Sequence, residues 1–274
     1  MKKVDVYQSL WGMRDLPNQE LPWSIEEQVC KIKEAGFDGI LQFVDDFSDE
    51  TQNLTELIKN AGLKLGLSCV GYHMEDIEGK IKYAKNCNAE FLNIMVKDYF
   101  IVGKEATLLL ENILRFGKAM MVPTFIETHR GTITQDLIRT TEYLKSIPEL
   151  QLTIDFSHYV VSGEISIPEE KVEECFDALL KRAAAIHIRI SNGEQVQVPI
   201  HGLDDGLYAN FIRWWQKGID YAMSHGEVKK PFPIVVELGP HPYQQKFSSP
   251  EGEWLYDYNR WEEALRWKNI IEKF

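Results

Sequence analysis

Short runs rich in β-branched residues alternate along the whole chain with longer amphipathic stretches, and this alternation constrains the fold more than any other feature. The runs recur roughly every 30 residues, which is the usual spacing of strand–helix units. Neither a long linker nor a low-complexity segment interrupts them, so we expect one domain over residues 1–274. The runs that we expect to form strands are Val4–Leu10, Gly39–Val44, Leu63–Val70, Glu90–Val96, Val122–Glu127, Gln151–Asp155, Ala184–Ile190 and Ile234–Leu238.

The stretches between these runs carry apolar residues at helical spacing, and several have recognisable helix boundaries. Ser24 follows Pro22 and precedes Glu27 by three residues, which is the pattern of a capping box. Ala61 and Gly62 close the next stretch, and glycine commonly ends helices. The expected helices are Trp23–Ala35, Thr51–Asn60, Met74–Asn86, Lys104–Ala119, Thr134–Ser146, Glu169–Arg182, Tyr208–Ser224 and Asn259–Glu272.

Eight strand–helix units are compatible with a closed barrel or with an open doubly wound sheet. The units account for all 274 residues with nothing left over. No glycine-rich phosphate-binding turn follows the first run, although such a turn is typical of doubly wound nucleotide-binding folds. Both observations favour an α/β protein with a single-domain (β/α)8 TIM barrel.

The balance of charge bears on the partners of the protein. The chain has 30 lysines and arginines against 42 aspartates and glutamates, a formal net charge of −12. Proteins that bind nucleic acid through its phosphates need a basic surface, so we expect no nucleic-acid partner.

No stretch resembles a signal peptide or a membrane span. The 4 cysteines lie far apart in the sequence, which is typical of free thiols in a reducing compartment. We therefore expect a cytoplasmic protein without a membrane partner.

Polar side chains cluster at the ends of the last four expected strands. In a barrel of this type, the chemistry is performed at the C-terminal ends of the strands. Glu127 and Asp155 end the fifth and sixth runs, and His187 and Glu237 lie near the ends of the seventh and eighth. Because strand side chains alternate between two faces, His187 and Arg189 point into the barrel if the isoleucines between them pack on the helices.

Three carboxylates that converge in a barrel repel one another unless a cation lies among them. One imidazole and three carboxylates suit Mn²⁺, Mg²⁺, Co²⁺ or a five- to six-coordinate Zn²⁺ better than a tetrahedral structural zinc. We therefore expect one divalent metal ion, with manganese preferred. Its expected ligands are Glu127, Asp155, His187 and Glu237.

Each of these four residues also has a plainer explanation when it is taken alone. An aspartate at a strand end often caps the turn that follows, and a buried histidine is more often a satisfied core residue than a ligand. The two glutamates could form ion pairs with Arg130, Arg189 or Lys97. Four such ends on four consecutive strands are harder to explain separately, because this layer of the core should be apolar.

The residues around the four expected ligands form recognisable motifs. They read Phe-Ile-Glu-Thr-His-Arg-Gly (125–131), Thr-Ile-Asp-Phe-Ser-His (153–158), Ile-His-Ile-Arg (186–189) and Val-Val-Glu-Leu-Gly (235–239). Together they resemble the xylose isomerase-like TIM barrel superfamily, the group of the sugar phosphate isomerases and epimerases. The resemblance covers nearly the whole chain and is clearest over residues 122–240. It implies the same four metal ligands and, through the Asp-x-x-His spacing, a histidine beside the substrate.

The resemblance also implies an activity, namely a metal-dependent isomerase or epimerase of keto-sugars or sugar phosphates in carbohydrate metabolism. A proton would leave the carbon beside the carbonyl and return to either face or to the neighbouring carbon, with Glu127 and Glu237 as base and acid. The family's usual arginine lies further beyond the histidine of the seventh strand than Arg189 does. The residues expected to contact the sugar are His158, Arg189, His73 and Trp11.

Other functions remain open at this point. A lyase or dehydratase on the same scaffold would remove the same proton from a keto-sugar or inosose and then expel a β-leaving group. An apurinic-site endonuclease would need several zinc ions and extra histidines, and the charge of −12 opposes it even though the chain has 7 histidines. A non-catalytic binding barrel would bind no metal.

The tryptophans of the later helices and loops suggest a homo-oligomer, although packing in the core explains them equally well. They are Trp214, Trp215, Trp254, Trp261 and Trp267.

Overall fold

The computed structural model describes residues 3–18, 20–202, 205–225, 230–248 and 254–274. Eight parallel strands form a closed barrel in chain order, and β1 pairs with β8 to complete it. The predicted (β/α)8 barrel is confirmed, and each predicted strand overlaps an observed one. The barrel strands are β1 (Val4–Ser9), β2 (Gly39–Phe43), β3 (Lys64–Gly71), β4 (Phe91–Val96), β5 (Thr124–Glu127), β6 (Leu152–Ile154), β7 (Ala183–Ile188) and β8 (Phe232–Val236).

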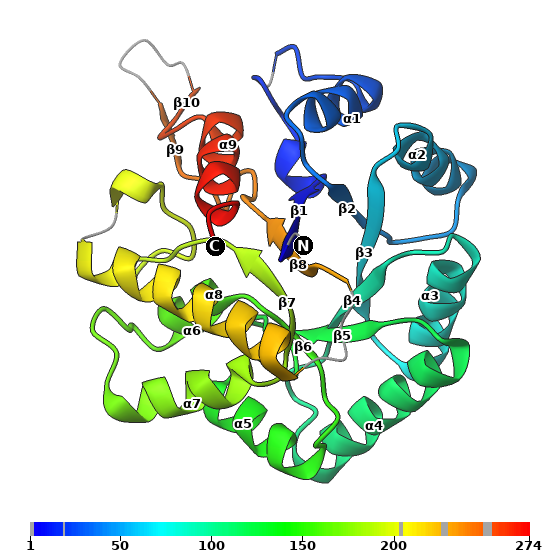
Figure 1. Ribbon diagram of the computed structural model, residues 1–274, viewed down its shortest axis with the longest axis vertical. Helices are drawn as coiled ribbons and strands as arrows, with labels where there is room; N and C mark the ends of the chain where they lie inside the picture. Colours follow the sequence, from blue (N-terminus) through cyan, green and yellow to red (C-terminus); the bar gives the residue numbers. More distant parts are fainter. Residues whose placement is uncertain (1–2, 19, 203–204, 226–229, 249–253) are drawn as a thin grey trace.

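Helices surround the barrel (Figure 1). All of the predicted helices are present, with ends that differ by a few residues. Ser24 and Glu27 form the predicted capping box, since the Ser24 hydroxyl accepts from the Glu27 amide at 3.2 Å and Glu27 Oε2 accepts from the Ser24 amide at 2.7 Å. The helices are α1 (Ile25–Glu34), α2 (Asp49–Asn60), α3 (Met74–Asn86), α4 (Gly103–Met120), α5 (Leu137–Ser146), α7 (Glu170–Leu180), α8 (Asp205–His225) and α9 (Arg260–Ile271).

Several short elements were not predicted, and all of them lie in segments that follow barrel strands. A helix of one or two turns is too short for apolar periodicity to reveal it. These segments leave the C-terminal ends of the strands, where the polar residues gather. The unpredicted elements are the 3-10 helices η1 (Trp11–Met13) and η2 (Ile200–Gly202), the helix α6 (Phe156–Ser162) and the hairpin strands β9 (Lys246–Ser248) and β10 (Trp254–Tyr256).

The interior of the barrel contains an apolar layer with large rings seated beside glycines. A Cβ atom at Gly39 would lie 2.3 Å from the Tyr7 ring, and one at Gly66 would lie 2.6 Å from the Phe91 ring. Both positions therefore need glycine, because the rings occupy the space of a side chain. The layer consists of Tyr7, Leu41, Phe91, Phe125, Ala185 and Val235.

The tryptophans of the outer helices belong to the core. Trp214, Trp215 and Trp267 are fully buried, so the hint of an interface that the sequence offered does not apply to them. Trp261 is partly buried and contacts the ring of Trp23 with centroids 6.0 Å apart. The side chain of Trp254 lies outside the described part of the structure. None of the helices described is both long and apolar enough to cross a membrane.

Candidate metal centre

The four predicted metal ligands meet at one end of the barrel. One donor atom of each lies within 4.8 Å of the donor atoms of the others. Glu127 ends β5, Asp155 follows β6, His187 lies in β7, and Glu237 follows β8. The exposed fractions are 1% for Glu127, 0% for Asp155 and His187, and 8% for Glu237. Four consecutive strands therefore bring the predicted set together in a site that excludes most water.

His187 faces the two glutamates through one nitrogen of its ring. Its Nδ1 lies 3.6 Å from Glu127 Oε1 and 3.0 Å from Glu237 Oε2. Burial lowers the pKa of His187, but the carboxylates of Glu237 and Glu127 outweigh burial and raise that pKa to about 10. His187 therefore carries a proton when no metal ion is bound, because the two carboxylates that attract this proton would also attract a metal cation.

Asp155 performs the capping role and also joins the cluster. Its Oδ1 accepts from the Ser157 amide at 2.9 Å and from the Ser157 hydroxyl at 2.6 Å, which caps the start of α6. Its Oδ2 accepts from the Arg189 guanidinium. The two explanations considered for this residue are therefore compatible, since each uses a different carboxylate oxygen.

Arg189 lies inside the cluster and bridges two of the predicted ligands. Its Nη2 donates to Asp155 Oδ2 at 2.6 Å and to Glu237 Oε2 at 2.7 Å. Tyr243 and Trp11 lie against the guanidinium, with their ring centroids 4.7 and 5.8 Å from Cζ. Burial opposes the charge of Arg189, but the two carboxylates raise its pKa. Burial raises the pKa of Glu237 and Asp155 adds to that effect, but His187 and, after it, Arg189 outweigh them and lower this pKa.

The charges of the cluster fit a divalent cation. Three carboxylates against one guanidinium leave two negative charges when His187 is neutral. One divalent ion would neutralise them, and oxygen and imidazole donors are the types that such ions bind. Asn93 contributes to the same site because its amide donates to Glu127 Oε2 and, at 3.0 Å, to the Ser68 hydroxyl. The residues present therefore fit a bound metal ion.

A pair of imidazoles lies beside the cluster. The rings of His129 and His158 have centroids 3.9 Å apart, and both can be grouped with Glu127 as donors within 4.8 Å of one another. His158 is 1% exposed, and both of its ring nitrogens are buried without a hydrogen-bond partner. Burial and the nearby charges of His129, Arg189 and Arg130 lower its pKa well below the usual value. His158 is therefore a neutral imidazole.

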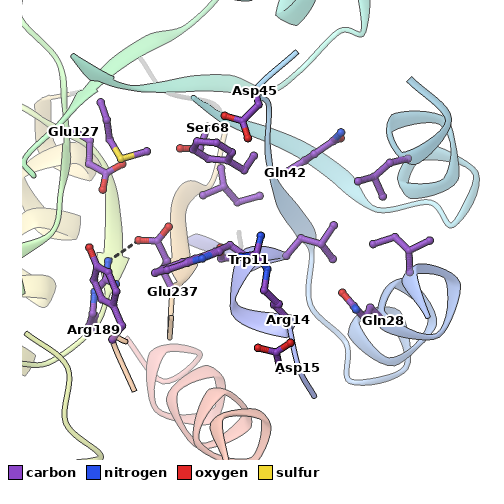
Figure 2. Close-up of a pocket in the computed structure, with 18 of the residues that line it drawn as sticks. Trp11, Arg14, Asp15, Gln28, Gln42, Asp45, Ser68, Glu127, Arg189 and Glu237 are labelled. Atoms are coloured by element: carbon purple, nitrogen blue, oxygen red, sulfur yellow. Dashed lines mark hydrogen bonds and ion pairs between the residues drawn. The ribbon is translucent and has the colours of Figure 1, made fainter. Parts of the chain in front are cut away.

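A pocket of about 700 Å³ opens over the cluster (Figure 2). Among the predicted site residues, Glu127, Glu237, Arg189 and Trp11 line it. Asp155, His187 and His158 are completely or almost completely buried and do not belong to its lining. The two glutamates thus reach the pocket, whereas the aspartate and the histidine of the predicted set lie behind them.

His73 lies at the surface, outside both the pocket lining and the buried cluster. It follows β3 where the chain turns outward into α3, and its Nδ1 accepts from the Asp76 amide at 3.3 Å. The ring is largely exposed and also lies 3.6 Å from Glu75 Oε2. The side chain caps a helix, so nothing in its position supports the expectation that His73 contacts the substrate.

Several residues that line the pocket or contact the cluster escaped the sequence reasoning. Tyr243 lies in an irregular segment after β8, and its hydroxyl is 3.3 Å from His129 Nε2. Asn93 and Ser68 lie within strands whose neighbours are apolar. A polar residue inside an otherwise apolar strand is a signal that could have identified the last two. No periodic pattern marks Tyr243.

Comparisons with known proteins agree with the architecture. No protein-family model matches the chain. A curated relative, the inosose dehydratase of Mesomycoplasma hyopneumoniae, is 23% identical over 264 residues, which cover 86% of this chain and 83% of that protein. A xylose isomerase-like TIM barrel protein from Mycobacterium smegmatis, solved in complex with magnesium, is 12% identical with a TM-score of 0.62, and the match covers 98% of this chain and 96% of that one.

The 3-keto-D-glucoside 4-epimerase YcjR of E. coli, in its apo form, is 14% identical with a TM-score of 0.59. The match covers 98% of this chain and 100% of that one. The chain therefore has the xylose isomerase-like TIM barrel fold that its motifs predicted.

Proposed function

We propose that the protein is a divalent-metal-dependent enzyme that removes the proton beside the carbonyl of a sugar and returns it, as an isomerase or epimerase does. One observation carries this proposal. Four strands bring three carboxylates and an imidazole within 4.8 Å of one another, and one guanidinium leaves two negative charges uncompensated once His187 is neutral, as a metal ligand must be. Mn²⁺ is the preferred ion, and Mg²⁺, Co²⁺ or Zn²⁺ would suit the same donors.

Glu127, Asp155, His187 and Glu237 would hold the ion. When bound, such an ion supplies a Lewis acid that polarises a carbonyl and stabilises negative charge on its oxygen. Asp155 and His187 lie behind the pocket, so their role is to hold the metal ion. Glu127 and Glu237 face the pocket, so each has a carboxylate within reach of a substrate.

The two glutamates are proposed as the groups that move the proton. Asn93 engages one oxygen of Glu127, and Arg189 engages one oxygen of Glu237, so both carboxylates are held in fixed orientations. Removal of the proton on one face and its return on the other would give epimerisation. Return to the neighbouring carbon would give isomerisation.

Unpaired buried atoms support substrate contacts by two further residues. Arg189 Nη1 and both ring nitrogens of His158 are buried without a hydrogen-bond partner among the described residues, although His158 Nε2 lies 3.6 Å from Asp155 Oδ2. Such groups cost about 1–3 kcal/mol each when nothing satisfies them, so oxygens of a bound sugar are natural partners. The ring of Trp11 lines the same pocket and offers an apolar surface to a sugar ring.

A lyase is the second candidate, and the name of the curated relative favours it, since that protein is an inosose dehydratase. The same proton would leave first. The electron pair of the broken C–H bond would then form a double bond as a β-hydroxyl departs and takes a proton to become water. His129 lines the pocket within 4.8 Å of Glu127 and could supply that proton.

The test is proton exchange in D₂O with manganese-loaded protein and a panel of keto-sugars and inososes, followed by NMR and mass spectrometry. We expect deuterium on the carbon beside the carbonyl, with an epimer or isomer as product. Loss of water with formation of an enone would establish the lyase instead. Glu237→Gln is the control and should lose exchange. A wild type that binds no divalent ion and exchanges no proton would refute both activities.

A further inference from the structure

We infer that the pocket contains a second subsite, between η1, α1 and β2, which receives the uncharged second group of a glycoside. The substrate would then be a glycoside carrying a sugar or aryl group, in preference to a free or phosphorylated monosaccharide. This inference rests on the proposed function, because the reacting ring must lie at the metal centre for the second group to reach this subsite.

The pocket extends well beyond the metal centre. Figure 2 shows Glu127, Arg189 and Glu237 on one side and Gln28 on the other, with Trp11 between them. Small-ligand pockets begin at about 300 Å³, and this pocket measures about 700 Å³. A single sugar ring held at the cluster would therefore leave the far part of the pocket unfilled.

The far part of the pocket has the mixed lining that recognises a ring with hydroxyl groups. Apolar side chains would face the ring, while carboxylate and amide groups would bind its hydroxyls. This lining comes from the segment between β1 and α1, from the first half of α1, from the end of β2 and the loop after it, and from α2. The residues are Arg14, Asp15, Pro22, Trp23, Ile25, Gln28, Gln42, Phe43, Asp45 and Leu54.

The polar groups of this lining are held in place by neighbouring contacts. Gln28 Nε2 donates to the Trp23 carbonyl at 2.9 Å, so its amide oxygen is the atom that can accept from a ligand hydroxyl. Gln42 is fixed at both ends, since it donates to the Thr51 carbonyl at 3.1 Å and accepts from the Thr55 hydroxyl at 2.9 Å. A wall whose side chains are already ordered loses little entropy when a ligand binds.

The charges of the lining argue against a phosphorylated substrate. Among the described residues that line the pocket, the lysine and arginine side chains are those of Arg14 and Arg189. Arg189 already bridges Asp155 and Glu237. Arg14 shares the far part with the carboxylates of Asp15 and Asp45. A phosphate is normally bound by several converging donors, and this lining would repel it, so the second group is uncharged.

Binding measurements on the metal-loaded protein test this inference. The probes are a free hexose, its methyl glycoside, its phenyl glycoside and its 6-phosphate, in the gluco and galacto series, followed by calorimetry or saturation-transfer NMR. We expect the phenyl glycoside to bind about tenfold more tightly than the free hexose, since it buries further apolar area, and the 6-phosphate to bind no more tightly than the free sugar. Equal affinity for free sugar and glycoside, or tighter binding of the phosphate, would overturn the inference.

Two variants that fill the far part sharpen the test. Gln28→Trp and Leu54→Phe should each abolish the advantage of the phenyl glycoside. Cys30→Trp adds the same bulk to α1 at an exposed position outside the lining, and it should keep that advantage. If both filling variants keep the advantage while remaining folded by circular dichroism, the second subsite is refuted.

Proton exchange and glycoside preference, both measured on the metal-loaded wild type, separate this inference from the proposed chemistry. If the wild type shows the glycoside preference without any proton exchange, the subsite is supported and the proposed chemistry fails. If proton exchange occurs without the glycoside preference, the proposed chemistry is supported and the second subsite is refuted.

Discussion

Two layers of the barrel interior differ sharply although they lie only two residues apart along the same strands. The lower layer contains Phe125, Ala185 and Val235, and two residues later the same strands or their ends carry Glu127, His187 and Glu237. Side chains at positions i and i+2 share a face of a strand. One face of one sheet thus changes from a closely packed apolar core to a cluster of ionisable groups within a single step.

The difference shows where stability and chemistry are separated. In the lower layer, rings fill the spaces beside glycines, as with Tyr7 over Gly39. In the upper layer, buried polar atoms of Asn93, His187 and Arg189 have no hydrogen-bond partner. Unpaired buried groups oppose folding. We therefore expect substitutions in the lower layer to reduce stability, and substitutions in the upper layer to reduce metal binding and activity.

The largest effect that tests this comparison is expected at Glu127. Replacement by Gln keeps the shape of the side chain but removes the group proposed to move the proton, so proton exchange should fall by about 10²–10⁴-fold. The free energy of unfolding of the metal-free protein should change little, because the removal of one of three converging carboxylates offsets the loss of its ion pair with His187. Urea unfolding and exchange in D₂O measure the two quantities. A large loss of stability with intact exchange would reverse the roles assigned to the layers.

A substitution in the lower layer should have the opposite effect, namely a loss of stability with metal binding retained. Phe91→Ala removes a fully buried ring that packs against Tyr7 and Phe125, and the cavity should lower the free energy of unfolding by about 3–5 kcal/mol. Urea titration measures this loss. Metal stoichiometry by elemental analysis should remain about one ion per chain in the folded variant. Loss of the ion from folded Phe91→Ala protein would show that the layers are not independent.

A dependence on pH is expected from His187 in the upper layer. Because its pKa is about 10 in the metal-free protein and a metal ligand must be neutral, binding releases about one proton, and affinity should fall about tenfold per unit of decreasing pH. Calorimetry in buffers of different ionisation enthalpy measures the released proton. A binding constant that does not change between pH 6 and 9 would exclude His187 as a ligand.

The raised pKa of His187 also predicts how the stability of the metal-free protein depends on pH. The folded-state pKa is raised above the ordinary value of 6.5, so the contribution of the protonated imidazole is fully present below about pH 6.5 and is lost as the pH rises to about 10. Urea unfolding between pH 6 and 10 measures the loss. His187→Gln should not show it, and an identical slope in that variant would assign the loss to another group.

The smallest effect concerns a residue that supports the upper layer without facing the pocket. Ser157→Ala removes the hydroxyl that donates to Asp155 Oδ1 at 2.6 Å. Partners of metal ligands typically contribute about 10–100-fold to affinity, so the metal dissociation constant should rise by about tenfold while stability changes by about 1 kcal/mol. Ser162→Ala, near the end of the same helix α6, is the control and should leave the dissociation constant unchanged.

Local periodicity was sufficient to predict the barrel and the four residues Glu127, Asp155, His187 and Glu237 that meet in it. The strand and helix patterns determined eight βα units, and alternation along β5 and β7 placed Glu127 and His187 inside the barrel. The short helix α6 was missed because seven residues give too little periodicity. The helix-capping position of His73 was missed because the end of β3 does not reveal that α3 begins directly after it.

The sequence by itself determined the strands, their order and the acidic and imidazole ends that meet in the barrel, because these follow from spacing along one segment. Only the tertiary structure decided that Arg189 bridges Asp155 and Glu237, and that Asn93 holds Glu127. It also decided that the start of α1 extends the pocket past Trp11. These contacts join residues from separate strands and helices, so they depend on how whole elements pack and not on any local pattern.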